Sequence, residues 1–184
     1  MRVTDDLTQD HRVIEVVLPV VDRLGREARQ SRVTDRAVAE AAIDFLRVFA
    51  DAFHHGKEEL ELFKAMERRG VRRDLGLVYH LLEEHGRGRK HVRALADSLP
   101  AAADGDAGAA ATFASNAGSY VKLLDHHIRE EDVELWPLAL RVLSEDDDMS
   151  MMESFAEIER KALGEGGVAS YRDRAAEIAR RAGL

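Results

Sequence analysis

The hydrophobic and polar positions of residues 113–138 repeat with the period of an α-helix. Spacings of three and four residues align one stripe that holds two polar side chains in its middle: Phe113, Ala117, Tyr120, Leu124, His127, Glu131, Leu135 and Leu138. Burying a histidine and a glutamate among apolar residues costs on the order of several kcal/mol unless they are paired or bound. The stripe therefore either holds a private hydrogen-bonded pair or faces a metal ion.

The same spacing predicts a first helix that runs to about Gln30, with Thr4, Asp5 and Asp6 as candidate N-caps. Pro19 lies inside this helix, where it should kink the axis or cost a backbone hydrogen bond. The apolar stripe includes one histidine, which we expect to point inward: Leu7, His11, Ile14, Leu18 and Val21.

A second, longer helix is predicted from a Thr34–Asp35 cap to about Arg69. Continuing its phase puts His54 on the shoulder of the buried face and His55 around the back. Periodicity alone leaves open which carboxylate accompanies the histidine, Glu58 or Glu61. The buried face itself consists of Ile43, Leu46, Ala50 and Phe53.

A third helix is expected from about Arg73 to Leu99, with a histidine near the centre of its inward stripe. His80 and His91 fall on the far side, where we expect them to face solvent or to support the site from outside. A flexible connection over 100–109 follows. The inward stripe of this helix contains Val78, Leu82, His85, Val92 and Ala96.

With a fourth helix over about 110–143, the pattern predicts an all-α protein built on an up-down-up-down four-helix bundle, residues 1–143. Residues 144–184 should form a C-terminal extension of two further helices that pack on the bundle or make a dimer contact. The first follows an acidic cap at 145–148 and has Met149, Met152, Phe155, Ile158 and Ala162 on one side. The last has Val168, Tyr171, Ala175, Ile178 and Ala182 inward.

Composition narrows the functional classes. A formal net charge of -8 argues against nucleic-acid binding, which needs a basic footprint. The absence of cysteine excludes disulfides and thiolate metal sites. The N-terminal residues lack an apolar signal core, and no window approaches a membrane span. We therefore expect a soluble cytoplasmic protein, monomeric or homodimeric.

Two segments, 54–63 and 127–136, repeat one pattern without a gap. The register equates His54 with His127 and Glu58 with Glu131. Each helix then offers a histidine and a carboxylate one turn apart on a common side, within reach of one metal region. The rival register, which uses His55 with Glu59, points away from the core on this phase.

Adding the inward histidines of the first and third helices brings four imidazoles and two carboxylates to one point. Mixed imidazole and carboxylate ligands suit iron, manganese or zinc, and two carboxylates able to bridge indicate two ions. The alternative is a polar network that satisfies itself without metal. The predicted ligands are His11, His54, Glu58, His85, His127 and Glu131.

This order of residues resembles the hemerythrin-like family, specifically the bacterial histidine-histidine-glutamate cation-binding domains, over roughly Asp6 to Leu143. The resemblance implies a non-haem di-iron centre bridged by the two glutamates and by an oxo or hydroxo group, with the four histidines as terminal ligands. The motifs that carry it are Asp10-His11, His54 with Glu58, Glu84-His85, and His127 with Glu131 before Leu135-Trp136-Pro137.

One position departs from the oxygen-carrying hemerythrins. They have a second histidine one turn after the histidine of the third helix, and this chain has Arg89 there, next to Gly88. Four histidines for two irons leave an open position for a small ligand. Tyr120, two turns before His127, is the candidate catalytic residue, because it could hydrogen-bond to that ligand or ligate the iron. The alternative is that Tyr120 is a core residue whose hydroxyl is satisfied elsewhere.

These features predict a protein that binds and turns over oxygen, peroxide or nitric oxide, through peroxidase-like, catalase-like or nitric-oxide-detoxifying activity. The alternatives are oxygen or iron sensing, storage or carriage without turnover, and a purely structural polar core. We expect His54→Ala or Glu131→Ala to lose metal and thermal stability together. On the helical phase used here, His55→Ala should do neither.

Overall fold

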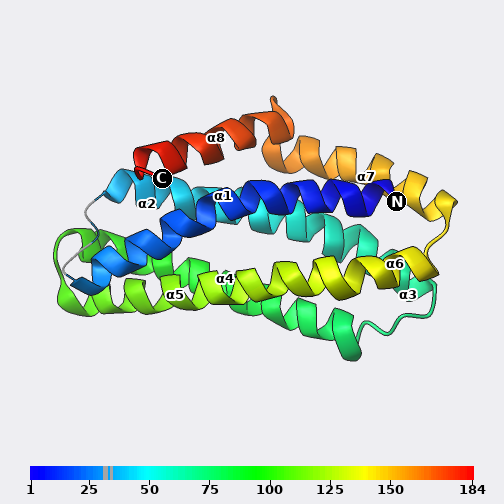
Figure 1. The fold of residues 1–184 in the computed structure, drawn as a ribbon, viewed down its shortest axis with the longest axis horizontal. Helices are drawn as coiled ribbons and strands as arrows, with labels where there is room; N and C mark the ends of the chain where they lie inside the picture. Colours follow the sequence, from blue (N-terminus) through cyan, green and yellow to red (C-terminus); the bar gives the residue numbers. More distant parts are fainter. Residues whose placement is uncertain (31–32, 34) are drawn as a thin grey trace.

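The computed structural model describes residues 1–30, 33 and 35–184, and this part of the chain forms helices and no strand. The all-α prediction is confirmed. Four helical rods lie side by side and alternate in direction (Figure 1). The first rod is α1 (Arg2–Gln30), which continues through Pro19, and the third is α4 (Gly76–Ala103).

The second and fourth rods change from α-helical to π-helical hydrogen bonding in mid-course. The second rod consists of α2 (Arg36–Phe45), η1 (Leu46–His55), η2 (Glu58–Leu62) and α3 (Phe63–Arg68). The fourth consists of α5 (Ala107–Glu130), η3 (Glu131–Leu135) and α6 (Trp136–Val142). Short π-helical stretches often mark functional sites, because the wider turn re-aims neighbouring side chains.

The first residues of α1 and α2 show one predicted boundary that is wrong and one that is confirmed. α1 begins at Arg2, before the predicted caps, because the Asp148 carboxylate accepts the backbone N–H groups of Arg2 (3.2 Å) and Val3 (3.0 Å). Asp35 caps α2 as predicted, accepting the Val38 N–H at 2.9 Å, while Thr34 lies outside the described residues.

The predicted connection over 100–109 is shorter than expected. α4 continues through Pro100 to Ala103, because the following alanines favour a helix and Ala102 is fully buried against the core. Asp106 then caps α5 by accepting the Ala109 N–H at 2.7 Å. Only residues 104–106 separate the two helices.

The two C-terminal helices, α7 (Glu145–Leu163) and α8 (Gly167–Arg181), pack along the first and second rods (Figure 1). Tyr171 and Phe155 are buried, as predicted. The predicted inward residue Met149 is instead half exposed. Because Asp148 faces α1, the buried stripe of α7 continues through Met151 rather than Met149.

A polar layer divides the core into two apolar clusters. Along each rod, the predicted metal ligands come after residues of one apolar cluster and before residues of the other. In α1, for example, His11 lies between Leu7 and Ile14, and in α4, His85 lies between Leu81 and Val92. The apolar clusters on both sides therefore keep the polar layer out of bulk water.

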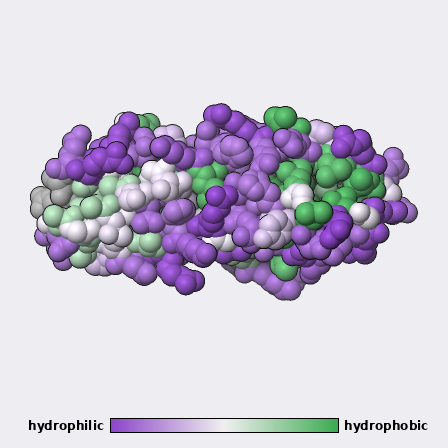
Figure 2. Space-filling view, turned by 90° about the horizontal axis from the view of Figure 1, so that it is seen from below, coloured by the Kyte–Doolittle hydropathy of each residue, from purple (hydrophilic) through white to green (hydrophobic). Residues whose placement is uncertain are grey.

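The surface is mostly hydrophilic in the view of Figure 2, with apolar side chains gathered toward one end. This is the end at which α6 and the beginning of α4 lie (Figure 1), and Tyr79 and Leu140 in these helices are about half exposed. None of the helices in the described ranges is both long and apolar enough to span a membrane.

Candidate metal centre

All six predicted ligands are buried in the polar layer, and the four rods bring them together. The imidazoles come one from each rod, and the two carboxylates come from η2 and η3. None of the six is more than 2% exposed: His11, His54, Glu58, His85, His127 and Glu131. Periodicity left open whether Glu58 or Glu61 accompanies His54. The structure favours Glu58, because Glu58 is buried and Glu61 is only partly buried.

The first half of the centre consists of His11 and His54. Their Nε2 atoms face each other at 3.1 Å. The His11 Nε2 also lies 3.0 Å from Glu131 Oε2, and the His54 Nε2 lies 3.7 Å from Glu58 Oε1.

The second half, His85 and His127, repeats this arrangement. The two Nε2 atoms are again 3.1 Å apart. The His127 Nε2 lies 3.1 Å from Glu131 Oε1, and the His85 Nε2 lies 3.5 Å from Glu58 Oε2. Each glutamate therefore offers one oxygen to each half, as a carboxylate that bridges two ions does.

Each of the four imidazoles directs its other nitrogen, Nδ1, to a carboxylate. These outer carboxylates fix the ring orientation and turn Nε2 toward the interior, as second-shell carboxylates of metal sites do. They are Asp132 on His11 (3.1 Å), Asp10 on His54 (3.3 Å), Glu59 on His85 (2.7 Å) and Glu84 on His127 (3.0 Å).

Sequence analysis did not assign the outer carboxylates, although a signal exists. Each is the sequence neighbour of a predicted ligand, but each contacts the histidine of a different rod. Asp10, for example, precedes His11 and contacts His54. Such cross-contacts depend on how the rods pack, so the phase of a single helix does not predict them.

Lys57 is a further residue that the sequence did not reveal. Its ammonium group is 1% exposed and contacts the carboxylates of Asp6 and Asp10. It also lies 4.2 Å from the centre of the Phe53 ring, a cation–π distance. Burial raises the pKa of Asp10 to about 7, although the Lys57 ammonium group acts to lower it. Lys57 thus supports the carboxylate that orients His54.

The prediction that His55 lies around the back of its helix is wrong. His55 is 5% exposed, and its ring stacks on that of His85, with centroids 3.9 Å apart and planes 15° apart. Because η1 is π-helical, each residue advances by a smaller angle than in an α-helix, so the adjacent residues His54 and His55 both face inward. Glu59, which the same phase directed outward, holds His85.

His80 and His91 lie at the periphery, as predicted. The His80 side chain is 48% exposed and its Nε2 lies 3.4 Å from Glu84 Oε1, so it supports an outer carboxylate. The His91 Nδ1 lies 2.9 Å from the Asn116 side-chain oxygen.

The donor set fits metal ions better than it fits itself. All four oxygens of Glu58 and Glu131 are buried, and none finds a hydrogen-bond partner of good geometry within the described residues. Unpartnered buried carboxylate oxygens are costly. Two nitrogens that bind one ion at about 2.1 Å and at a right angle are about 3.0 Å apart, close to the observed Nε2 separations.

The charges of the metal-free centre divide between its two glutamates. Burial and the neighbouring Glu131 raise the pKa of Glu58 well above its usual range. Burial acts in the same direction on Glu131, but His127 and His11 outweigh it and hold the pKa of Glu131 well below its usual range. The ionised Glu131 therefore attracts protons to the two imidazoles beside it.

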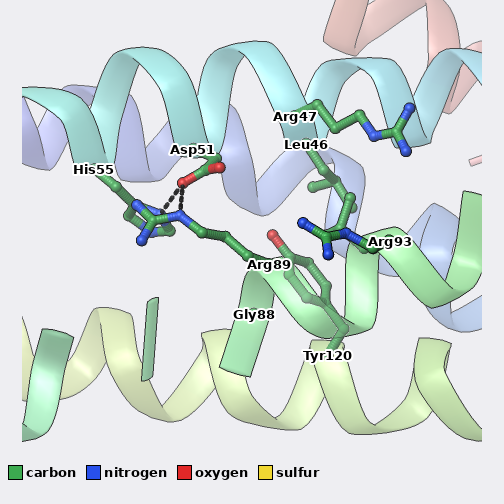
Figure 3. Close-up of a pocket in the computed structure, with 9 residues that line it drawn as sticks. Leu46, Arg47, Asp51, His55, Gly88, Arg89, Arg93 and Tyr120 are labelled. Carbon is green, nitrogen blue, oxygen red and sulfur yellow. Dashed lines mark hydrogen bonds and ion pairs between the residues drawn. The ribbon is translucent and has the colours of Figure 1, made fainter. Parts of the chain in front are cut away.

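Tyr120 and Arg89 lie beside the centre in a pocket of about 250 Å³, which His55, Asp51 and Gly88 also line. Figure 3 shows the Tyr120 hydroxyl directed into this pocket and the Arg89 side chain extended toward Asp51. The Arg89 guanidinium contacts Asp51 (2.7 Å) and Glu59 (2.5 Å). The structure thus places Tyr120 in a pocket that His55 also lines.

Comparison with known proteins agrees with this geometry. Residues 2–139 match the hemerythrin HHE cation binding domain family. The chain is 28% identical over 183 residues to uncharacterized proteins of Mycobacterium bovis and Mycobacterium tuberculosis, which covers 98% of this chain and 70% of each relative. No solved structure matches the chain. Since the family match includes most of the chain and every predicted ligand, the chain belongs to the hemerythrin HHE cation-binding domain family.

Proposed function

We propose that this protein holds two iron ions, with an oxo or hydroxo bridge, and that the loaded centre binds and turns over a small oxidant. The observation that carries the proposal is the convergence of four Nε2 atoms on two buried glutamates whose oxygens have no hydrogen-bond partner of good geometry among the described residues. His11 and His54 would hold one ion, and His85 and His127 the other. Glu58 and Glu131 would bridge them.

Iron accepts this set of imidazole and carboxylate donors and also has redox chemistry. Imidazole and carboxylate donors also accept manganese and zinc, but zinc has no redox chemistry. When bound, the iron pair supplies electrons to, or accepts them from, oxygen, peroxide or nitric oxide. The chain holds the imidazoles in one orientation through the outer carboxylates and excludes bulk water with the two apolar clusters.

The centre has room for an external ligand. Each half supplies two imidazoles and two glutamate oxygens, and four donors leave positions free on an octahedral ion. We propose that Tyr120, whose hydroxyl faces the adjacent pocket (Figure 3), donates a hydrogen bond to a ligand that enters there. Burial raises the pKa of Tyr120, so the phenol keeps its proton.

A carrier, sensor or storage protein is the second candidate, because the same centre could hold a ligand or iron without turnover. Kinetics separate the two. Iron-loaded protein is mixed with oxygen, hydrogen peroxide or nitric oxide, and its optical spectrum and the oxidant concentration are followed together. Turnover predicts consumption of many equivalents of one oxidant with return of the starting spectrum. A stable spectral change with about one equivalent consumed would instead favour carriage or sensing. No spectral change with any oxidant would reject turnover and ligand carriage, and a protein that binds no iron would reject storage as well.

A further inference from the structure

The two halves of the centre are related by the sequence repeat, and His55 is where the relation fails. In the register that equates His54 with His127, the counterpart of His55 is Ile128. Both residues are buried, His55 at 5% exposure and Ile128 at 3%. An imidazole therefore stands beside the centre on one side, where an apolar side chain stands on the other.

His55 has the same local arrangement as the four imidazoles described above. Its Nδ1 lies 3.4 Å from a carboxylate oxygen of Asp51, on the preceding turn. Its Nε2 is buried and has no hydrogen-bond partner within the part of the chain that the structure describes. A buried ring nitrogen without a partner is rare, because the loss of its hydrogen bonds to water is not compensated.

The position of His55 also fits the second half of the centre. Its ring stacks on His85 and lies edge-on to His127, with ring centroids 5.6 Å apart. One ligand atom from each of His55, Glu58, His85 and His127 lies within 4.8 Å of the others.

We propose that His55 is a fifth imidazole ligand, so that the two metal positions are inequivalent. The second half would hold its ion with the three imidazoles of His55, His85 and His127, and the first half with the two of His11 and His54. This inference rests on the proposed metal pair. The π-helical η1 makes it possible, because it turns two consecutive residues toward the same centre.

The decisive variant is His55→Ile. It replaces the imidazole with the residue type of its counterpart in the sequence repeat, Ile128. We expect the iron of the second half to dissociate to a competing chelator at least about 10-fold faster, because the loss of a direct ligand should cost no less than the loss of an outer-shell partner, with the first-half position unchanged. The two iron signals of the Mössbauer spectrum, distinct in the wild type, should converge. His91→Ala, which removes a peripheral histidine, should match the wild type in both measurements.

Two further measurements keep the proposal testable if His55→Ile folds poorly. The wild type alone should show two distinct iron environments, and a single environment would overturn the proposal. In His55→Ala, added imidazole can enter through the pocket that His55 lines and should restore slow dissociation of the second ion. Free imidazole that changes nothing would count against ligation.

The outcomes also separate this inference from the proposed function. A wild type that binds two irons, with a His55→Ile variant that binds both as tightly and with the same spectrum, overturns only the role of His55. A wild type that binds no iron pair overturns the proposed function, and this inference with it.

Discussion

The two halves of the centre make the most informative comparison in this molecule. Each has two imidazoles with Nε2 atoms 3.1 Å apart, outer carboxylates on both Nδ1 atoms and an aromatic ring stacked on one histidine. Trp136 stacks on His11 at 5.7 Å, and Phe63 stacks on His85 at 6.1 Å. The arrangement proposed to hold the metal ions is thus repeated, down to the supporting residues.

The halves differ in what surrounds the repeated set. In the first half the outer carboxylate Asp10 contacts the buried Lys57, whereas in the second half Glu84 contacts the half-exposed Arg87 and His80. The second half also has His55 in place of an isoleucine. The inner donors are therefore alike in the two halves, and the residues around them are what could make the two proposed metal positions different.

The largest expected effect comes from removing a residue that both halves share. Glu131→Ala deletes the oxygens that face His11 and His127, so both ions should be lost. Breaking this buried set costs roughly 3–5 kcal/mol of unfolding free energy in the metal-free protein, and the additional stabilisation by iron disappears. Elemental analysis and thermal unfolding with and without iron check this. Retention of two irons by the variant would contradict a bridging role.

Removing the cation that supports each outer carboxylate should affect the halves unequally. Lys57→Met leaves the Asp10 carboxylate, 2% exposed, without its buried partner, at a cost of roughly 3–5 kcal/mol. The matched variant Arg87→Met removes a half-exposed guanidinium from Glu84 and should cost about 0–1 kcal/mol. Denaturant unfolding measures both. Equal losses would show that the two outer carboxylates are supported in the same way.

The pH dependence of the metal-free protein should expose opposite shifts within the second half. Burial acts to lower the pKa of His127, but Glu131 and Glu84 outweigh it and raise the pKa to about 9. A raised pKa means that its contribution is present below pH 6.5 and is lost as the pH rises through 9, by roughly 3 kcal/mol. Burial and His55 lower the pKa of His85 to about 3, so its contribution is lost as the pH falls below 6.5.

Thermal unfolding in the presence of a chelator, measured across this range, tests the two shifts by comparison of each variant with the wild type. His127→Gln should reduce the loss of thermal stability at alkaline pH, and His85→Gln should reduce the loss at acidic pH. If both variants change the same side, the assignment of the two shifts is wrong.

The smallest effect is expected at Tyr120. Tyr120→Phe removes the hydroxyl that faces the pocket but keeps the buried ring, so metal content should be unchanged and stability should change by less than about 1 kcal/mol. The rate of oxidant consumption should fall about tenfold if one hydrogen bond to the ligand is lost. An unchanged rate would assign Tyr120 to the core alone.

The sequence predicts the six inner residues through two local signals. An α-helical period of 3.6 places His11 and His85 on apolar stripes, and the repeated spacing of histidine and glutamate fixes the register of the other two rods. Both signals are local to one helix or to a pair of similar segments, so a single sequence contains them.

What the sequence does not predict depends on contacts between rods or on a change of helix type. His55 turns inward because η1 is π-helical, and a prediction with a fixed angle per residue directs it outward. Lys57 is buried because Asp6 and Asp10 of another rod meet it. The start of α1 depends on Asp148, which is 145 residues from Val3 along the chain.

The most direct test of a two-ion centre is a crystal structure of iron-loaded protein with diffraction data collected at the iron absorption edge. The account predicts two anomalous peaks per chain, one beside His11 and His54 and one beside His85 and His127, with Glu58 and Glu131 between them. Iron-loaded crystals without anomalous density at this centre, or with iron bound only at the surface, would contradict it.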